Sequence, residues 1–555
     1  MSVYDLETVH APRLTGMPLR AMARALENPV VRSIAMVKLL ADAGFDKWRA
    51  KVVDEPPTGM PLVRPAVRPK AVGLDMREMP PEPVVRALPT VRDHAASYRN
   101  GTSTPVEVAQ KVLAAIRAAD GGPDPLHLFI AVHEDDVLEQ AKASAERINA
   151  GKARSALDGV PVAIKDEVDQ AGYPTTVGTK FLGDKPAVSD ATTVARLRAA
   201  GALLIGKTNM HEIGINPDGQ NVHYGACKNP WNPAHDTGGS SSGSAAAVAA
   251  GLCPVALGAD GGGSIRIPAA LCGVVGLKPT YGRISEYGAA PLCWSVAHLG
   301  PIGATVADVA WAYYAMAGKD DRDPNTRAQP RVSMEGWDRT GLSGLTIGMF
   351  PEWFKDAEPE VVSACEAMLR VFENAGASVK EIRIPDMGGA QMAHAATILS
   401  EMAAAMGDNL DRLSDFGPAV RINLCVGMAL TARDYVDAQR WRTHALATYK
   451  DIFREVDLVA TPATAATAPM IPPGGDSGGW SDLAATAEAM RYVVPGNFCG
   501  MPAISFPAGY DKKGLPIGMQ VMGRWWDEHV LLGVASVAER NMERRTPPVH
   551  FDVLR

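Results

Sequence analysis

The chain has 555 residues, of which 46% are apolar and 21% charged, an ordinary composition for a globular protein. Its formal net charge is −7, from 55 basic and 62 acidic residues, and it has no long run of Lys and Arg. This balance argues against a nucleic acid partner. Seven scattered cysteines, an odd number without a CxxC pair, predict reduced and mostly buried thiols rather than a zinc site.

The opening residues lack the charged and then apolar pattern of a signal peptide. The longest apolar run, residues 245–259, is too short to span a bilayer and contains Gly251 and Pro254. We therefore expect a cytoplasmic protein, and a peripheral contact with a membrane stays open.

Residues 1–90 have the character of an N-terminal extension. Two short helical stretches between Pro18 and Ala41 are separated by Pro29, and residues 54–90 are rich in proline. Such a proline-rich arm favours extended backbone that lies along a surface. The predicted helices carry basic residues among apolar ones, so they could lie on a membrane, cap a substrate channel, or pack on the main domain or a second copy.

Residues 91–555 alternate short apolar strands with helices, which predicts an α/β fold with helices on the faces of a sheet. Thr104-Pro-Val-Glu107 has the form of a capping box ahead of a helix at 106–119. Residues 386–445, rich in Ala and Met, are predicted to be mostly helical. Further helices are predicted at 191–200 and 244–250, and strands at 159–165, 202–205, 254–258, 345–349 and 457–461.

Three segments have residues suited to catalysis. The first ends in a lysine, and the second contains a run of serines. Lys165 ends the strand 159–165; alone it would be expected at the surface, but a buried amine disfavours its charged form and can then accept a proton. Thr237-Gly-Gly-Ser-Ser-Ser-Gly-Ser244 resembles a flexible linker, yet a helix follows at once. This predicts a tight turn that presents hydroxyls at a helix N-terminus.

The third segment is Asp260-Gly-Gly-Gly-Ser264, whose glycines allow successive N–H groups to converge on one oxygen. A serine hydroxyl is a weak nucleophile and needs a neighbouring base. No histidine lies in a suitable motif, and His211 and His235 are expected in loops as surface or packing residues. The three segments together therefore predict acyl transfer through a tetrahedral oxyanion that relies on serines and a lysine.

These segments resemble the amidase signature family, and the likeness extends over roughly residues 91–540. The matching motifs are Val162-Ala-Ile-Lys165-Asp166, Gly238-Gly-Ser-Ser-Ser-Gly-Ser244, Asp260-Gly-Gly-Gly-Ser264-Ile-Arg266-Ile-Pro268, Cys272-Gly-Val-Val-Gly-Leu-Lys278-Pro279-Thr280, Asp457-Leu-Val-Ala-Thr461-Pro462 and Gly514-Leu-Pro-Ile-Gly518. The resemblance implies a large mixed β-sheet core flanked by helices on both faces.

The resemblance also implies roles for individual residues. Ser264 would be the nucleophile, Ser240 a bridging serine after a cis peptide bond, and Lys165 the base. Asp260 and Arg266 would support the loop. Main-chain N–H groups would form the oxyanion hole at Gly261, Gly262, Gly263 and Ser264. No metal or organic cofactor is implied.

A narrower resemblance is to plant-type fatty acid amide hydrolases. It rests on Asp5-Leu-Glu-Thr-Val-His-Ala-Pro12, Leu14-Thr-Gly16, the loop 237–243 and Met522-Gly-Arg-Trp525. It implies long-chain acyl amides such as N-acylethanolamines as substrates, a homodimer and peripheral membrane contact. An acyl chain needs an apolar channel, for which residues 386–445 and four particular positions are candidates: Met490, Thr486, Ile213 and Gly219.

Three other interpretations stay open. The chain could be an amidase of the same family that acts on small, aryl or peptide amides. It could be the amidotransferase subunit that works on charged transfer RNA, which would need partner subunits and would not need residues 1–90. It could also be a catalytically silent scaffold or lipid-binding protein, against which the presence of Lys165, Ser240 and Ser264 together argues.

Overall fold

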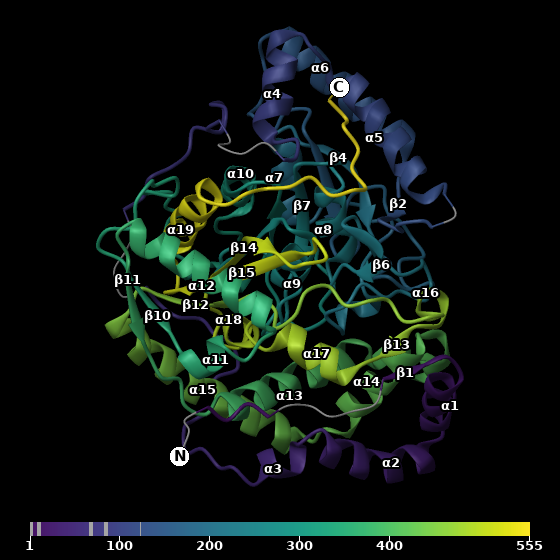
Figure 1. Cartoon of the computed structure of the whole chain (residues 1–555). Helices are drawn as coiled ribbons and strands as arrows, with labels where there is room; N and C mark the ends of the chain where they lie inside the picture. The colour runs from purple at the N-terminus through teal and green to yellow at the C-terminus, as the bar shows by residue number, and fades with distance from the viewer. Residues whose placement is uncertain (1–3, 8–12, 66–69, 83–86, 123, 555) are drawn as a thin grey trace.

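A sheet of 11 strands runs through the molecule (Figure 1). Its strand order is β11-β10-β12-β15-β14-β8-β9-β7-β3-β4-β2. The computed structural model describes residues 4–7, 13–65, 70–82, 87–122 and 124–554. Residues 8–12 of the opening motif, and residues 66–69 and 83–86 of the proline-rich arm, lie outside this description. In chain order the strands are β2 Phe129–Ala131, β3 Pro161–Lys165, β4 Leu203–Thr208, β7 Val255–Ala259, β8 Val275–Lys278, β9 Leu299–Gly303, β10 Thr346–Met349, β11 Ser378–Glu381, β12 Leu458–Pro462, β14 Ala503–Tyr510 and β15 Pro516–Gly523.

The sheet is mixed, as predicted. β3 pairs in parallel with both β4 and β7, and β10 pairs in parallel with β11 and β12. Between these two parallel groups, β9, β8, β14 and β15 form a run of antiparallel pairs. The C-terminal ends of β3 and β7 therefore meet at one edge of the sheet, where the predicted site residues follow.

Helices cover both faces of the sheet, and the strands explain why. Alternate residues of a strand point to opposite faces. Val162 and Ile164 pack in a core cluster with helix α10 (Val306–Met316) and helix α19 (Glu528–Arg540), whereas Ala163 packs with helix α8 (Ser242–Ala249). Every residue of α8 is buried, and its small side chains let it lie close to the strands.

Several predicted elements are confirmed. Helix α5 (Pro105–Asp120) begins with the predicted capping box, because Thr104 and Glu107 exchange hydrogen bonds. Helix α7 (Thr192–Ala199) and α8 lie where helices were predicted, and the five predicted strands correspond to β3, β4, β7, β10 and β12. One placement was wrong: His235 lies in strand β6 (Asn232–Asp236), paired with β5 (Lys228–Asn229), rather than in a loop. All seven cysteines are buried and free.

The N-terminal segment packs along the helices of the 386–445 region, at the bottom of Figure 1. It forms α1 (Gly16–Glu27), α2 (Pro29–Asp42) and α3 (Phe45–Arg49), the last of which the sequence did not indicate. These contact α13 (Met387–Ala405) and α14 (Pro418–Ala429), and the following arm lies on α15 (Ala432–Glu455). Within the described residues, no helix is both long enough and apolar enough to cross a membrane.

Candidate active site

Lys165 stands at the edge where two parallel strands end. It closes β3, and Ala259 closes the neighbouring strand β7. The Lys165 side chain turns inward and is 1% exposed. Its Nζ donates to Ser240 Oγ at 2.8 Å and to the main-chain oxygen of Ala259 at 3.3 Å, and Glu167 Oε2 lies 2.7 Å away. The lysine is thus held in the interior, directed at a serine hydroxyl.

The loop that carries Ser240 leads directly into the buried helix α8. The Gly239–Ser240 peptide bond is cis, and Gly239 N–H donates to the Pro217 oxygen at 2.8 Å. A Cβ atom on Gly239 would overlap the main-chain oxygen of Asp218, so only glycine fits there. The Ser240 main-chain oxygen accepts from His211 N–H at 3.2 Å. These contacts fix Ser240, which is 2% exposed, beside the lysine.

Ser264 lies in the glycine-rich segment that follows β7, and it is 7% exposed. Its main-chain oxygen accepts from Ser241 N–H at 3.3 Å, which joins the two serine loops. Among the contacts found between described residues, no hydrogen bond links Ser264 Oγ with Ser240 Oγ. The structure therefore brings the two serine loops together and joins Lys165 to Ser240. Within the described residues, it does not join the hydroxyl of Ser240 to that of Ser264.

The buried carboxylate of Asp260 holds the glycine-rich loop through hydrogen bonds to its main chain. Its carboxylate pairs with Arg266 Nε at 3.0 Å, and both side chains are fully buried. Burial would raise the pKa of Asp260, but the charge of Arg266 and its hydrogen bonds outweigh burial and hold the pKa well below the usual range. The same carboxylate accepts from Gly263 N–H at 2.6 Å and Ile265 N–H at 3.1 Å. A charged pair thus fixes the backbone around Ser264.

This network narrows the set of free main-chain donors. Because Gly263 N–H is already bound to Asp260, it is not available to an incoming oxyanion. No acceptor in the described part of the chain is found for the N–H groups of Gly261, Gly262 and Ser264. The oxyanion hole predicted over four residues is thus reduced to three candidates.

Comparison with known proteins decides the family. A family model described as Amidase matches residues 110–532. The chain belongs to the amidase signature family. It is 37% identical to a fatty acid amide hydrolase of Medicago truncatula, over 99% of this chain and 96% of that protein. It is also 36% identical to a glutamyl-tRNA(Gln) amidotransferase subunit of a Roseiflexus species, over 81% of this chain and 96% of that one.

The fold agrees with solved amidases. The crystal structure of the peptide amidase from Stenotrophomonas maltophilia superposes with a TM-score of 0.70 at 30% identity, covering 83% of this chain and 98% of that one. The protein is therefore an amide-bond hydrolase with the amidase signature fold. Within the described residues, no group of three or more His, Cys, Asp or Glu side chains is arranged to hold a metal ion.

Among the site residues that the sequence did not reveal are His394 and Asn497. His394, on α13, contacts the Gly261 main-chain oxygen through Nε2 at 2.8 Å. Burial lowers the pKa of His394 to about 4, so the ring is neutral and donates from Nε2. Asn497, on α18 (Val494–Phe498), donates to the Asp260 main-chain oxygen at 2.7 Å. Neither residue lies in a motif, so only the folded chain reveals them.

Of the four predicted channel residues, two lie on the helix that contacts the glycine-rich loop, and two lie near the loop that carries Ser240. A Cβ atom on Gly262 would come within 3.0 Å of Met490 Cε, which places Met490 against the glycine-rich loop. Thr486 lies one turn earlier on the same helix, α17 (Leu483–Met490). Ile213 is next to Gly214, and Gly214 lies beside Ser240: a Cβ atom added to Gly214 would be 3.3 Å from Ser240 Oγ. Gly219 instead packs against Thr237 and Asp236, further back in the serine loop.

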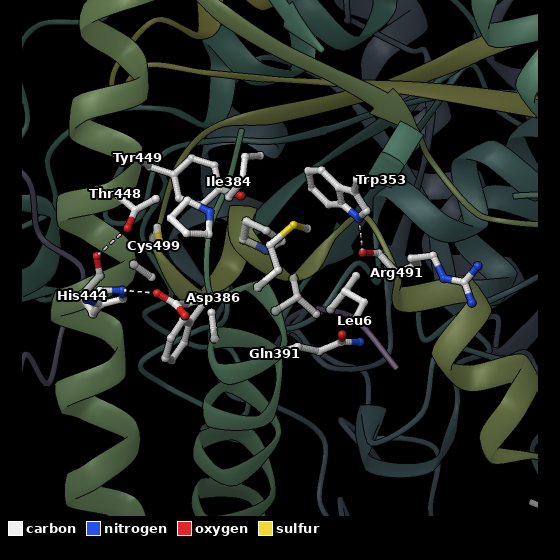
Figure 2. Close-up of a pocket in the computed structure, with 17 residues that line it drawn as sticks. Leu6, Trp353, Ile384, Asp386, Gln391, His444, Thr448, Tyr449, Arg491 and Cys499 are labelled. Atoms are coloured by element: carbon white, nitrogen blue, oxygen red, sulfur yellow. Dashed lines mark hydrogen bonds and ion pairs between the residues drawn. The ribbon is translucent and has the colours of Figure 1, made fainter. Parts of the chain in front are cut away.

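A separate pocket opens between the start of α13, α15 and α18 (Figure 2). Most of its lining is apolar, and His444 and Asp386 face each other at one side (Figure 2). Neither the serines and lysine described above nor the four predicted channel residues are among the described residues that line it. The pocket adjoins the site through α18, because that helix also carries Asn497. Its apolar lining includes Leu6, Trp353, Ile384, Met387, Tyr449 and Phe498.

Proposed function

We propose that the protein hydrolyses long-chain fatty acid amides, such as N-acylethanolamines, through an acyl-enzyme on Ser264. The observation that supports this most strongly is the buried contact of 2.8 Å between Lys165 Nζ and Ser240 Oγ, beside the loop that carries Ser264. A serine needs a base to attack an amide, and a lysine shielded from water can serve when it is uncharged.

In the first half-reaction, Lys165 accepts a proton from Ser240 while Ser240 accepts one from Ser264. Ser264 Oγ forms a bond to the amide carbon, and the carbonyl electrons move onto the oxygen. The N–H groups of Gly261, Gly262 and Ser264 stabilise this oxyanion; one such donor is typically worth about 3 kcal/mol. Hydrogen bonds between catalytic groups are often longer in a free enzyme and tighten with substrate, as required here for the two serines.

To complete the first half-reaction, the proton returns from Lys165 through Ser240 to the departing nitrogen as the C–N bond breaks, which leaves the acyl-enzyme on Ser264. Protonation matters because an amide expels its amine poorly otherwise. In the second half-reaction, a water molecule attacks the acyl-enzyme and its proton passes through Ser240 to Lys165; the proton then returns to Ser264 Oγ as the C–O bond breaks and the free acid leaves. Every proton taken from a nucleophile is thus delivered to a leaving group.

The apolar surroundings of the serines support a lipid substrate. Met210, Ile213 and Leu292 belong to the same core cluster as Leu19 and Leu26 of α1. Met210 and Leu292 also flank Gly214, next to Ser240 Oγ. Apolar side chains therefore continue from the N-terminal helices to the site, and each CH₂ of an acyl chain buried there would contribute about 0.8 kcal/mol.

A panel of acyl ethanolamides of increasing chain length tests the substrate class on the purified enzyme. We expect kcat/KM to rise with chain length, and Ser264→Ala to abolish both turnover and labelling by a fluorophosphonate. Full turnover by that variant would refute the nucleophile. Higher kcat/KM with short, aryl or peptide amides would favour an amidase of other specificity.

The same preparation separates the remaining alternatives. A second polypeptide that copurifies would favour the amidotransferase role on charged transfer RNA. Absence of fluorophosphonate labelling in the folded wild-type protein would favour a silent scaffold or lipid-binding protein.

The outer face of α2 supports a peripheral membrane contact. Val30, Ile34 and Val37 are 69%, 72% and 72% exposed and recur at helical spacing, and the neighbouring Lys38 is exposed as well. An apolar ridge beside basic groups is suited to the surface of an anionic bilayer. Cosedimentation with anionic vesicles, lost in Ile34→Asp, tests this contact. The homodimer implied by the family resemblance stays a prediction, which light scattering of the purified protein tests.

A further inference from the structure

Helix α13 begins without a capping side chain of its own. Its N-cap residue, Asp386, has a left-handed backbone with a φ of 58°, and its carboxylate contacts His444 Nε2 at 3.1 Å instead of the helix. The first turn contains Gly388 and Gly389 and has no acidic residue. Glycine is a weak helix former, and the first N–H groups of a helix have no partner within it. The start of α13 therefore depends on contacts from elsewhere in the chain.

Asp5 supplies the missing cap. Its Oδ1 accepts from Gly388 N–H at 2.9 Å, although 383 residues separate the two. Gly388 is the second residue of the helix, a position whose N–H commonly donates to the side chain of an ordinary N-cap residue. A carboxylate is also favourable at the positive end of a helix dipole. A Cβ atom on Gly388 would come within 2.8 Å of the Asp5 main-chain oxygen, so the lack of a side chain there lets the two segments touch.

The strap, residues 4–7, is held in place on both sides of Asp5. Tyr4 packs edge-on against Phe350, with the ring centroids 5.9 Å apart. Leu6 lines the pocket at the start of α13 (Figure 2). Both side chains pack against the core cluster that includes residues of α13 and α15. The carboxylate of Asp5 is therefore presented to the helix by neighbours that are themselves packed.

His394 lies less than two turns after Gly388 on the same helix, and it reaches the glycine-rich loop. Its Nε2 donates to the Gly261 main-chain oxygen at 2.8 Å. The peptide bond between Gly261 and Gly262 is trans and planar, so its N–H points opposite to its C=O. By holding that C=O, His394 fixes the direction of the Gly262 N–H, one of the three candidate donors to the oxyanion.

We infer that Asp5 is a positioning residue for the oxyanion hole: by capping α13, it keeps His394 where the ring directs the Gly262 N–H. The inference rests on the proposed function, since the oxyanion hole belongs to that mechanism. Without the cap, the glycine-containing first turn unwinds more often, and His394 is held less firmly against the loop. The effect falls on the transition state, because the oxyanion forms there and is absent from the bound amide. It should therefore appear in kcat rather than in KM.

The first test is kcat and KM, on the amide that the wild type cleaves best, for three variants of the strap. Asp5→Ala should lower kcat by about two- to fivefold, the order of effect that an N-cap has on the start of a helix, with KM unchanged. Asp5→Asn keeps an acceptor oxygen, although it loses the ion pair with Lys51 at 3.6 Å, and should stay near wild type. Glu7→Ala is the matched control, because Glu7 pairs with the exposed Lys47 rather than with α13, and it should equal wild type.

A second substitution tests the route through His394. His394→Phe keeps a ring and removes the donor, so kcat should fall by more than in Asp5→Ala, toward the roughly 10²–10³-fold cost of one lost oxyanion donor. Residues that act through one another give non-additive effects. Asp5→Ala should therefore lower kcat no further when His394→Phe is already present. A further loss equal to that seen in wild type would overturn the inference, since Asp5 would then act by a separate route.

A long-chain trifluoromethyl ketone reports on the oxyanion directly, because the serine oxygen adds to its carbonyl carbon and leaves the charge on the carbonyl oxygen. Its inhibition constant should rise in Asp5→Ala by the same factor as kcat/KM falls. An unchanged inhibition constant beside a lowered kcat, or a wild-type kcat in Asp5→Ala, would overturn the inference, and this comparison decides the matter if His394→Phe does not fold. Failure of the proposed function would appear instead as turnover that persists in Ser264→Ala.

Discussion

The side-chain amide of Asn497 donates to the main-chain oxygen of Asp260 at 2.7 Å and to its carboxylate at 2.9 Å. These residues are 237 positions apart. Asn497 also accepts from Arg266, so one fully buried amide joins the charged pair to the backbone it supports. The loop before Ser264 is thus held from the C-terminal part of the chain as well as from its own strand.

Asn497→Ala should destabilise the fold and lower catalysis together. It leaves buried polar atoms of Asp260 and Arg266 with one partner fewer, which costs about 1–3 kcal/mol. Because the loop itself shifts, we expect kcat to fall more than KM rises. Urea unfolding and steady-state kinetics measure both effects. Asn541→Ala, at an exposed helix end, is the control and should change neither.

Arg266→Met should cost about 3–5 kcal/mol of unfolding free energy, because it leaves the Asp260 carboxylate buried without its counter-charge. The exposed pair of Lys38 and Asp42 provides the comparison, since its side chains are 79% and 59% exposed. Lys38→Met should cost less than about 1 kcal/mol. Equal losses in the two variants, measured by denaturant unfolding, would contradict the importance assigned to the buried pair.

Gly239→Ala should displace Ser240, because the added Cβ would overlap the main-chain oxygen of Asp218. A main-chain atom cannot move away without a shift of the backbone. A misplacement of about 1 Å at a catalytic group can cost on the order of 100-fold in rate, so we expect kcat/KM and fluorophosphonate labelling to fall by that order. Gly59→Ala is the matched control, since a Cβ there meets nothing within 4 Å. Wild-type activity in Gly239→Ala would show that the loop tolerates the shift.

His444 should make stability depend on pH. Its two ring nitrogens face Glu55 at 2.7 Å and Asp386 at 3.1 Å, so both can donate when the ring is protonated. Burial lowers the pKa of His444, but the two carboxylates outweigh burial and raise it above 6.5.

Because the folded-state pKa of His444 is the higher one, its stabilisation is complete below the unfolded value of about 6.5 and is lost as pH rises through the folded value. The melting temperature of wild type should thus exceed that of His444→Gln most at mildly acidic pH, and the gap should close toward alkaline pH. A gap that widens with pH would contradict this assignment.

The sequence predicted the local elements of this amidase better than its long-range contacts. Apolar runs and the box at Thr104 identify strands and helices because those signals are local. The place of β9 between β7 and β8 depends on pairing between distant segments, which no local pattern records. His394 and Glu167 were missed for a related reason: His394 lies in a helix without a motif, and Glu167 becomes notable only once its carboxylate is seen beside Lys165.

The docking of the N-terminal segment has a consequence for biosynthesis. Arg49 pairs with Asp434 at 2.8 Å, 385 residues later in the chain, and Phe45 and Trp48 complete a core cluster with residues of α15. At about 5–20 residues per second, a ribosome needs roughly 20–80 s to supply those partners. Throughout that interval Phe45 and Trp48 lack their partners on α15, so the start of the protein exposes aromatic surface that favours aggregation during translation.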